Sequence, residues 1–246
     1  MKFYKELSKV YDVVFPKNEN TLKFLCKDLK GNSKVLDLAC GTGSYSIALA
    51  LKGHRVDAID LDEEMIDIAR SKGGLYVNFV AGDMTEIKEE FKGKRYNLIY
   101  CIGNSIVHLK NKERIQSFIE DAYEVLNEEG IFIVQIVNYD RIIKYDVKSL
   151  PTIEDSSKGV KFIRNYNYKS EEGKVEFQTE LIISKESKEE SYKNSVDLIA
   201  LEKDELQAMF EKAGFSNIEV YGNFSEEEYS DKSFSLVIKG VKNNYK

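Results

Sequence analysis

The residues best suited to chemistry lie in the segment DLACGTG, which continues a short apolar run. It places Asp37 near the end of that run and two glycines, Gly41 and Gly43, directly after it. At a turn from strand to helix, such glycines leave backbone N–H groups free and let a polar ligand approach the chain closely. A dinucleotide, a phosphate, a sulfonium compound and plain turn geometry are all candidate explanations for the loop.

Two further carboxylates end apolar runs downstream of this loop. Asp60 ends the run RVDAID, roughly 20 residues after the glycines, where a carboxylate can accept hydrogen bonds from both hydroxyls of a ribose. Asp83 lies in AGDM, at the end of the next apolar run. Both residues have plainer explanations, because an aspartate commonly begins or caps the helix that follows a strand.

The spacing of the glycines argues against two of the candidate ligands. A dinucleotide site requires a third glycine three residues after the second, and that position is Ser46. A phosphate loop requires Gly-Lys followed by Ser or Thr, and no such sequence follows Gly43. A nicotinamide-dependent oxidoreductase is therefore disfavoured.

The elements that position these residues alternate between strand and helix patterns from residue 33 to about residue 138. The runs KVLDL, RVDAID, YVNFVA, YNLIYCI and IFIVQIV are mostly apolar, as buried strands of a parallel sheet are. Apolar residues recur at helical spacing from Ile115 to Leu126, and Asp62 is placed to cap another helix. This alternation predicts a parallel sheet with right-handed crossovers.

The pattern changes after the segment NYDRII. Apolar and polar residues alternate over residues 160–168, 175–183 and 192–200, with SEEG as a turn, which predicts an antiparallel meander with one solvated face. A helical pattern from Leu206 to Ala213 then precedes NIEVYG and SFSLVIKG. These two runs predict a hairpin at the edge of the parallel sheet.

The segment VLDLACGTG closely resembles the glycine loop of class I S-adenosylmethionine-dependent methyltransferases, with Ala39 in place of the first glycine of the family pattern. The resemblance implies that Asp60 binds the ribose, that Asp83 contacts the adenine amine, and that Met84 packs on the adenine ring. The full set of cofactor contacts that it implies is Tyr11, Asp37, Ala39, Gly41, Gly43, Asp60, Leu61, Asp83, Met84, Cys101 and Ile102.

The same resemblance implies a Rossmann-like α/β fold. Its mostly parallel seven-stranded sheet would carry a C-terminal antiparallel hairpin strand and a small antiparallel β insertion. We expect an N-terminal lid and the S-adenosylmethionine-binding core over residues 1–140, the insertion on the acceptor side over residues 141–200, and the final helix and edge strands over residues 201–246.

Two segments, YCIGNSIVHL and QIVNYDRII, resemble those of the glycine N-methyltransferase family, and sugar-amine N,N-dimethyltransferases are similar. By position, the resemblance implies that Asn104 directs its amide oxygen at the acceptor nitrogen, with His108 nearby. The glycine enzymes carry an arginine just before NYD that holds the substrate carboxylate. Here that residue is Val137, which argues against glycine as the substrate, although Arg141 or Arg164 could take its place in space.

Methyl transfer from a sulfonium is an in-line displacement with an excellent leaving group, so the protein mainly aligns the reacting atoms and excludes water. An acceptor amine must lose its proton before it attacks, and the ordinary pKa of His108 suits a general base. The plainer roles are a structural hydrogen bond for His108 and loop capping for Asn104.

Aromatic residues are candidates for the remaining pocket walls. Tyr4, Tyr11 and Phe15 precede the first strand, where this family often folds a helix over the cofactor as a lid. Four tyrosines could line an acceptor cleft or simply form the core of the meander: Tyr139, Tyr166, Tyr168 and Tyr192.

Composition limits the partners and the setting. A net charge of -6 over 246 residues makes nucleic acid an unfavourable partner. No apolar run approaches the roughly 20 residues of a membrane helix, and the first residues lack the apolar core of a secretion signal. We therefore expect a cytoplasmic location, and the three scattered cysteines predict reduced thiols. With only two histidines and no clustered cysteine or aspartate ligands, we expect no metal site.

The sequence therefore predicts a methyltransferase that uses S-adenosylmethionine and acts on a small-molecule acceptor, with an amine or amino sugar preferred. The alternatives are O-methylation of a small metabolite and a module that binds S-adenosylmethionine without turning it over.

Overall fold

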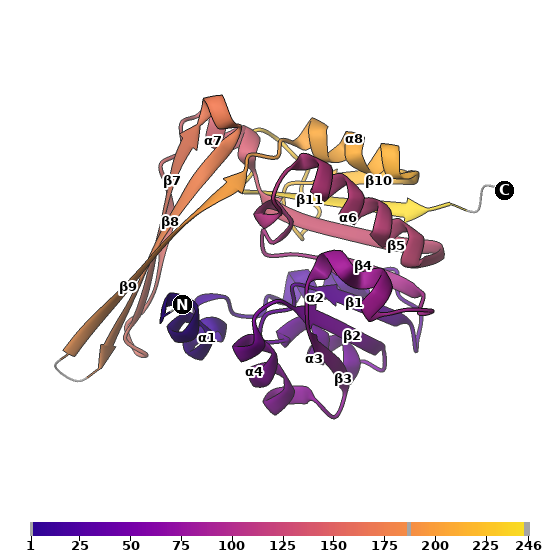
Figure 1. The fold of residues 1–246 in the computed structure, drawn as a ribbon, viewed down its shortest axis with the longest axis horizontal. Helices are drawn as coiled ribbons and strands as arrows, with labels where there is room; N and C mark the ends of the chain where they lie inside the picture. The colour runs from indigo at the N-terminus through magenta and orange to yellow at the C-terminus, as the bar shows by residue number, and fades with distance from the viewer. Residues whose placement is uncertain (1, 186–187, 244–246) are drawn as a thin grey trace.

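The computed structural model describes residues 2–185 and 188–243, which form two β-sheets flanked by helices (Figure 1). The helices are α1 (Lys2–Val14), α2 (Glu19–Cys26), α3 (Ser44–Leu51), α4 (Glu63–Gly73), α5 (Ile87–Glu90), α6 (Lys112–Val125), α7 (Tyr139–Lys144) and α8 (Lys203–Ala213). Single 3-10 turns are η1 (Met84–Glu86), η2 (Ile106–His108) and η3 (Ser170–Glu172). The strands are β1 (Lys34–Leu38), β2 (Arg55–Asp60), β3 (Val77–Ala81), β4 (Tyr96–Cys101), β5 (Leu126–Val137), β6 (Ser149–Asp155), β7 (Val160–Lys169), β8 (Lys174–Lys185), β9 (Lys188–Ile199), β10 (Phe215–Tyr221) and β11 (Ser235–Lys242).

The larger sheet has seven strands in the order β10-β11-β5-β4-β1-β2-β3. Neighbours from β5 to β3 are parallel, whereas β11 runs antiparallel to both β5 and β10. The predicted Rossmann-like α/β fold, with its mostly parallel sheet and antiparallel C-terminal hairpin, is confirmed. Because the strand order changes direction at β1, the carboxyl ends of β1 and β4 open a crevice of the kind in which such sheets bind ligands.

Both faces of this sheet are covered, which explains why its strands read as apolar runs. Leu36 and Leu38 of β1 pack in a cluster with residues of α5, α6 and α8, whereas Val35 packs in a second cluster with residues of α2, α3 and α4. Local signals agree with this arrangement, since Asp62 caps α4 by accepting hydrogen bonds from the N–H groups of Glu64 and Met65.

The smaller sheet is an antiparallel meander in the order β6-β7-β8-β9, lying between α7 and α8 in the chain. Three of its strands match the predicted segments, and β6 was not expected. Strand β6 contains Pro151 and pairs irregularly with β7. Because it is largely exposed, its sequence lacks the alternation of apolar and polar residues by which the other strands were found.

Helix α1 lies between the small sheet and the core (Figure 1). Its apolar side chains, among them Phe3 and Leu7, form a separate cluster with Phe162, Leu181 and Tyr192 of the meander. No helix among the described residues is long and apolar enough to cross a membrane.

Candidate functional site

The loop between β1 and α3 is shaped by left-handed backbone conformations. Ala39, Gly41 and Gly43 have φ values of 59°, 55° and 73°. A Cβ atom on Gly43 would lie 2.6 Å from the ring of Phe79, so this position has no space for a side chain. No side chain caps the start of α3, which leaves its N–H groups available to a polar ligand.

Asp60 lies beside this loop at the end of β2. Its Oδ2 atom accepts a hydrogen bond from the N–H of Gly41 at 2.7 Å, and its Oδ1 atom accepts one from the N–H of Asp62 at 3.0 Å. Each carboxylate oxygen has a second lone pair, so Asp60 keeps the capacity to accept from ligand hydroxyls. The next residue, Leu61, is 76% exposed, as expected for an apolar side chain that a bound ligand could cover.

Asp83 follows β3, the neighbour of β2, at the same edge of the sheet. Its Oδ1 atom accepts hydrogen bonds from the N–H and the hydroxyl of Thr85, both at 2.8 Å. This is the capping role that the sequence offered as the plainer explanation. The described contacts leave its Oδ2 atom free, and the adjacent Met84 packs partly against the main core.

Asp37 is a buried carboxylate without a cationic partner among the described residues. Ser46 and Tyr100 donate hydrogen bonds to its Oδ2 atom, the latter at 2.7 Å. Burial raises the pKa of Asp37 to about 7, and the two hydrogen bonds offset that effect only in part. A buried acid of this kind favours a positively charged ligand group nearby, because the charge of the ligand would compensate the desolvation of the carboxylate.

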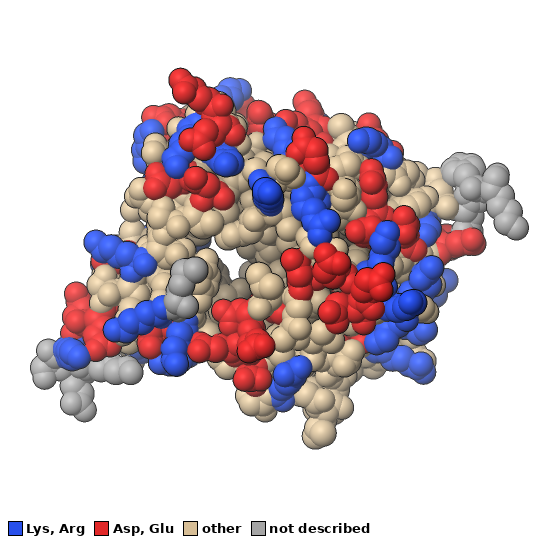
Figure 2. Space-filling view, in the orientation of Figure 1, with Lys and Arg blue, Asp and Glu red and all other residues tan. Residues whose placement is uncertain are grey.

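A cavity of about 460 Å³ joins this loop to the small sheet. Ala39 and Thr42 line one end, Tyr11 of α1 lies against the loop, and Thr179 and Asn194 of the meander line the other end. The Tyr11 ring packs so closely that a Cβ on Gly41 would lie 3.1 Å from it. Figure 2 shows a hollow between the small sheet and the core, bordered largely by uncharged residues.

The acidic side chains of the cavity wall are two carboxylates, of which Asp12 pairs with Lys72 outside the lining. Asp12 and Asp37 line the cavity, whereas no lysine or arginine does so among residues 2–185 and 188–243. The two arginines considered as substitutes for the carboxylate-binding residue lie elsewhere. The Arg141 guanidinium is 4.5 Å from the centre of the Phe234 ring, and Arg164 donates a hydrogen bond to the carbonyl of Pro151 at 2.7 Å.

His108 lines the cavity and retains an exposed surface there. The surrounding protein partly buries the imidazole, and this burial disfavours the charged form and lowers the pKa of His108 below the ordinary histidine value. The Asn104 side chain does not line the cavity. Its Oδ1 atom accepts a hydrogen bond from the N–H of Val137 at 2.9 Å, and its Nδ2 atom donates one to the Tyr139 hydroxyl at 3.2 Å. These contacts support a loop-fastening role for Asn104, and its contact with an acceptor stays a prediction.

The structure brings together only part of the predicted set. Tyr11, Asp37, Ala39, Ile102 and His108 line the cavity. Gly41, Gly43 and Asp60 lie in the adjoining loop and strand end, and Leu61, Asp83 and Met84 lie further along the same edge, outside this cavity. Cys101 is fully buried at the end of β4 and is not part of the lining. The four tyrosines follow the alternative explanation and pack in the hydrophobic clusters: Tyr139, Tyr166, Tyr168 and Tyr192.

An ion-pair network at the base of α1 was not found from the sequence. Asp12 accepts hydrogen bonds from the hydroxyls of Thr42 and Ser44 at 2.6 and 2.9 Å, and it pairs with Lys72 of α4 at 2.7 Å. A single aspartate in an amphipathic helix gives no sequence signal for such a role. The network fastens the N-terminal helix to the glycine loop.

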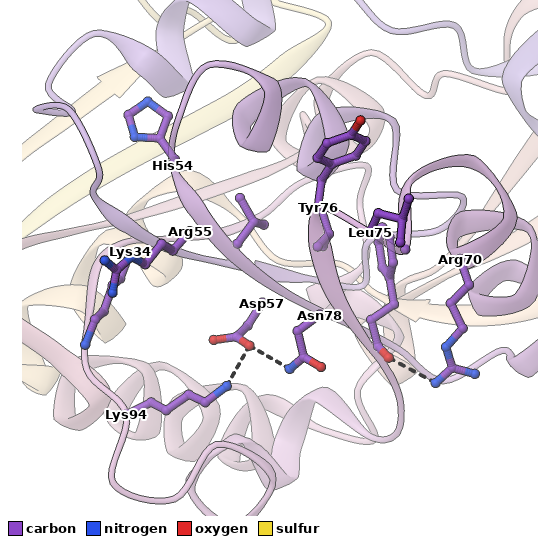
Figure 3. A pocket seen from close by; sticks show the side chains of 13 residues that line it. Lys34, His54, Arg55, Asp57, Arg70, Leu75, Tyr76, Asn78 and Lys94 are labelled. Carbon is purple, nitrogen blue, oxygen red and sulfur yellow. Dashed lines mark hydrogen bonds and ion pairs between the residues drawn. The ribbon is translucent and has the colours of Figure 1, made fainter.

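A second, larger hollow of about 940 Å³ lies at the opposite edge of the sheet, along β3 (Figure 3). It is built at the amino ends of β1 and β2, away from the strand ends where such sheets bind ligands. Several of its polar groups pair with one another, since Asp57 contacts Lys94 and Asn78, and Arg70 donates to the carbonyl of Phe79. We therefore place the functional site in the smaller cavity.

Comparisons with known proteins identify the kind of protein that this chain is similar to. A family model described as "Methyltransferase domain" matches residues 35–130. Glycine/sarcosine N-methyltransferase from Aphanothece halophytica is 29% identical over 214 residues, which cover 85% of this chain and 77% of that protein. The solved structure of the CcbJ methyltransferase from Streptomyces caelestis has a TM-score of 0.80 and 20% identity and covers 95% of each chain. The SAM-bound amino pentose methyltransferase CalS10 from Micromonospora echinaspora has a TM-score of 0.69 and 15% identity, over 95% of this chain and 97% of that one.

Proposed function

We propose that this chain, which is a class I S-adenosylmethionine-dependent methyltransferase, methylates the nitrogen of a small amine that carries no acidic group, such as an amino sugar. The observation that carries the proposal is the cavity that runs from the glycine loop to the small sheet. Its described wall contains two carboxylates and neither lysine nor arginine.

The residues at the cofactor end fit S-adenosylmethionine. The glycine loop allows close approach, Asp60 can accept from the ribose hydroxyls, and Asp37 can compensate the ammonium of the methionine part. When bound, this cofactor supplies a methyl group made electrophilic by the sulfonium charge. The chain itself contributes binding, alignment and exclusion of water.

The acceptor end favours an amine that carries hydroxyl groups and no carboxylate. Relatives of this chain are named for glycine and sarcosine, whose carboxylate calls for a cationic partner in a buried site. Val137 stands where the glycine enzymes carry their arginine, and the cavity wall offers apolar surface from Phe177 and Val196 beside polar groups of Thr179 and Asn194. Such a wall suits a ring with an apolar face and several hydroxyls.

The state of His108 favours nitrogen over oxygen as the acceptor atom. Its lowered pKa keeps the imidazole neutral at pH 7, so it can take a proton from an ammonium group. A positively charged cofactor in the same cavity would further favour the neutral form of the amine, since like charges disfavour one another.

Incubation of the protein with S-adenosylmethionine and a panel of amines, with products identified by mass spectrometry, tests this proposal. The panel contains amino sugars and amino alcohols, together with glycine and sarcosine. We expect methylation of the amines that carry no carboxylate. The kcat/KM for glycine should be at least about 100-fold lower, which corresponds to the loss of a charge-assisted contact. Preferred methylation of glycine or of alcohols would overturn the proposed acceptor, and cofactor binding without any product would favour the binding module.

A further inference from the structure

Gln135 occupies a position between the cofactor loop and the acceptor end of the cavity. The strand register aligns three paired residues on neighbouring strands: Leu38, Cys101 and Val134. The residues that directly follow them, Ala39, Ile102 and Gln135, all line the cavity. Because neighbouring strands lie about 4.8 Å apart, Gln135 is about 10 Å from the glycine loop, on the side where the chain continues into the meander.

The hydrogen bonds of Gln135 fix the direction of its amide group. Its Oε1 atom accepts a hydrogen bond from the N–H of Gly103 at 2.8 Å, and its backbone carbonyl accepts one from the N–H of Asn104 at 3.1 Å. A backbone N–H can only donate, so the side-chain oxygen must face Gly103 and the NH2 group must face away from it. Among the described residues no acceptor pairs with that NH2 group, which leaves two donors at the cavity.

We propose that Gln135 is an acceptor-binding residue whose Nε2 group donates to an oxygen atom next to the amine that is methylated. The inference rests on the proposed function and narrows its substrate class to amines that carry a neighbouring hydroxyl or ether oxygen. An attacking amine must direct its lone pair at the methyl group, and its remaining N–H groups are donors. The donors of Gln135 therefore cannot pair with the amine itself, whereas an adjacent oxygen satisfies them.

If Gln135 only holds the Gly103 turn, a variant that keeps this contact should keep the natural preference among acceptors. Gln135→Glu keeps an oxygen for the Gly103 N–H and removes the NH2 donors. Gln135→Leu removes both and serves as the structural control. The comparison of the two variants separates the contact with Gly103 from the contact with an acceptor.

The test measures kcat/KM for trans-2-aminocyclohexanol and cyclohexylamine at saturating S-adenosylmethionine, together with calorimetric cofactor affinity. We expect the natural protein to prefer the amino alcohol by about tenfold, the effect of one well-placed hydrogen bond. In Gln135→Glu that preference should fall to about one, with cofactor affinity changed less than about twofold. The charge of the new carboxylate affects both probes alike, because both are cationic amines. A hydroxyl can donate to that carboxylate, so trans-2-methoxycyclohexylamine, whose ether oxygen can only accept, is measured beside them and reports the oxygen contact alone.

The possible outcomes separate the two proposals. Equal methylation of both amines by the natural protein, or a preference for the methoxy amine over cyclohexylamine that survives in Gln135→Glu, overturns the inference and leaves the proposed function intact. A loss of cofactor affinity in Gln135→Glu that matches the loss in Gln135→Leu assigns the residue to the loop structure instead. If neither amine is methylated by the natural protein, the proposed amine acceptor is overturned, and the inference with it.

Discussion

The two ends of the cavity are built on different principles. At the cofactor end, the loop after β1 and the acids beside it lie within residues 37–83, at the ends of three neighbouring strands. At the acceptor end, the wall comes from α1, β5, β8 and β9, which are far apart in the sequence. The cofactor end is thus formed by backbone shape and strand ends, whereas the acceptor end is formed by side chains that tertiary packing brings together.

Helix α1 belongs to both ends and couples them. Asp12 ties it to the hydroxyls of Thr42 and Ser44 in the glycine loop, while Phe3 and Leu7 pack on the meander. A ligand that displaces α1 from the loop must therefore also disturb the acceptor wall. This coupling makes it useful to perturb each end separately.

The largest contrast should come from matched glycine substitutions in the two regions. Gly43→Ala forces a side chain into the left-handed region and into the Phe79 ring, and Gly173→Ala in the meander meets the same backbone restriction with nothing within 4 Å. We expect a loss in the free energy of unfolding of about 2–5 kcal/mol for the first and about 1–2 kcal/mol for the second. Chemical denaturation of both variants measures the difference. Equal losses would contradict the close contact between the Gly43 position and the Phe79 ring.

A second contrast separates cofactor binding from acceptor binding. Asp60→Ala should remove hydrogen bonds to the ribose worth roughly 1.5–3 kcal/mol, which weakens cofactor affinity by about tenfold to a hundredfold. The KM for the amine, measured at saturating cofactor, should change little. Asp57→Asn is the control, because Asp57 lies on the same strand but contacts Lys94 and Tyr96 at the opposite end. Calorimetry showing unchanged affinity in Asp60→Ala would reject the ribose role.

The glycine loop and the strand ends of the proposed cofactor site could be predicted from the sequence because their requirements are local. Positive φ values select glycine at Gly41 and Gly43, and a strand that ends at a binding edge leaves a polar residue such as Asp60 after its apolar run. The seven-stranded sheet followed from the alternation of apolar runs and helical patterns. What remained beyond reach was the network around Asp37, since nothing in the sequence connects it with Ser46 and Tyr100.

The acceptor end could be predicted only in outline. The alternation in the meander revealed its strands, yet alternation is the same for a core and for a cavity wall. The tyrosines could therefore not be assigned to either, and Thr179 and Asn194 were overlooked. One signal was present. Gln135 interrupts the otherwise apolar run IFIVQIV, and a polar residue within a buried strand calls for a partner.

The smallest expected effect is the release of a proton from Asp37 when the cofactor binds. Acceptor binding should release no proton from this group. The folded protein holds the pKa of Asp37 at about 7, above the value of about 3.9 in an unfolded chain. Stability from this group is therefore fully present below about pH 4 and is lost as the pH rises toward 7, because the native state retains a proton that the unfolded state releases. A cofactor ammonium beside the carboxylate should lower this pKa, so that binding releases most of a proton at pH 6 and about half of one at pH 7. Calorimetry in two buffers of different ionisation enthalpy measures that release, and Asp37→Asn should abolish it. A binding heat that is independent of the buffer, or an unchanged release in the variant, would mean that Asp37 does not release a proton when the cofactor binds.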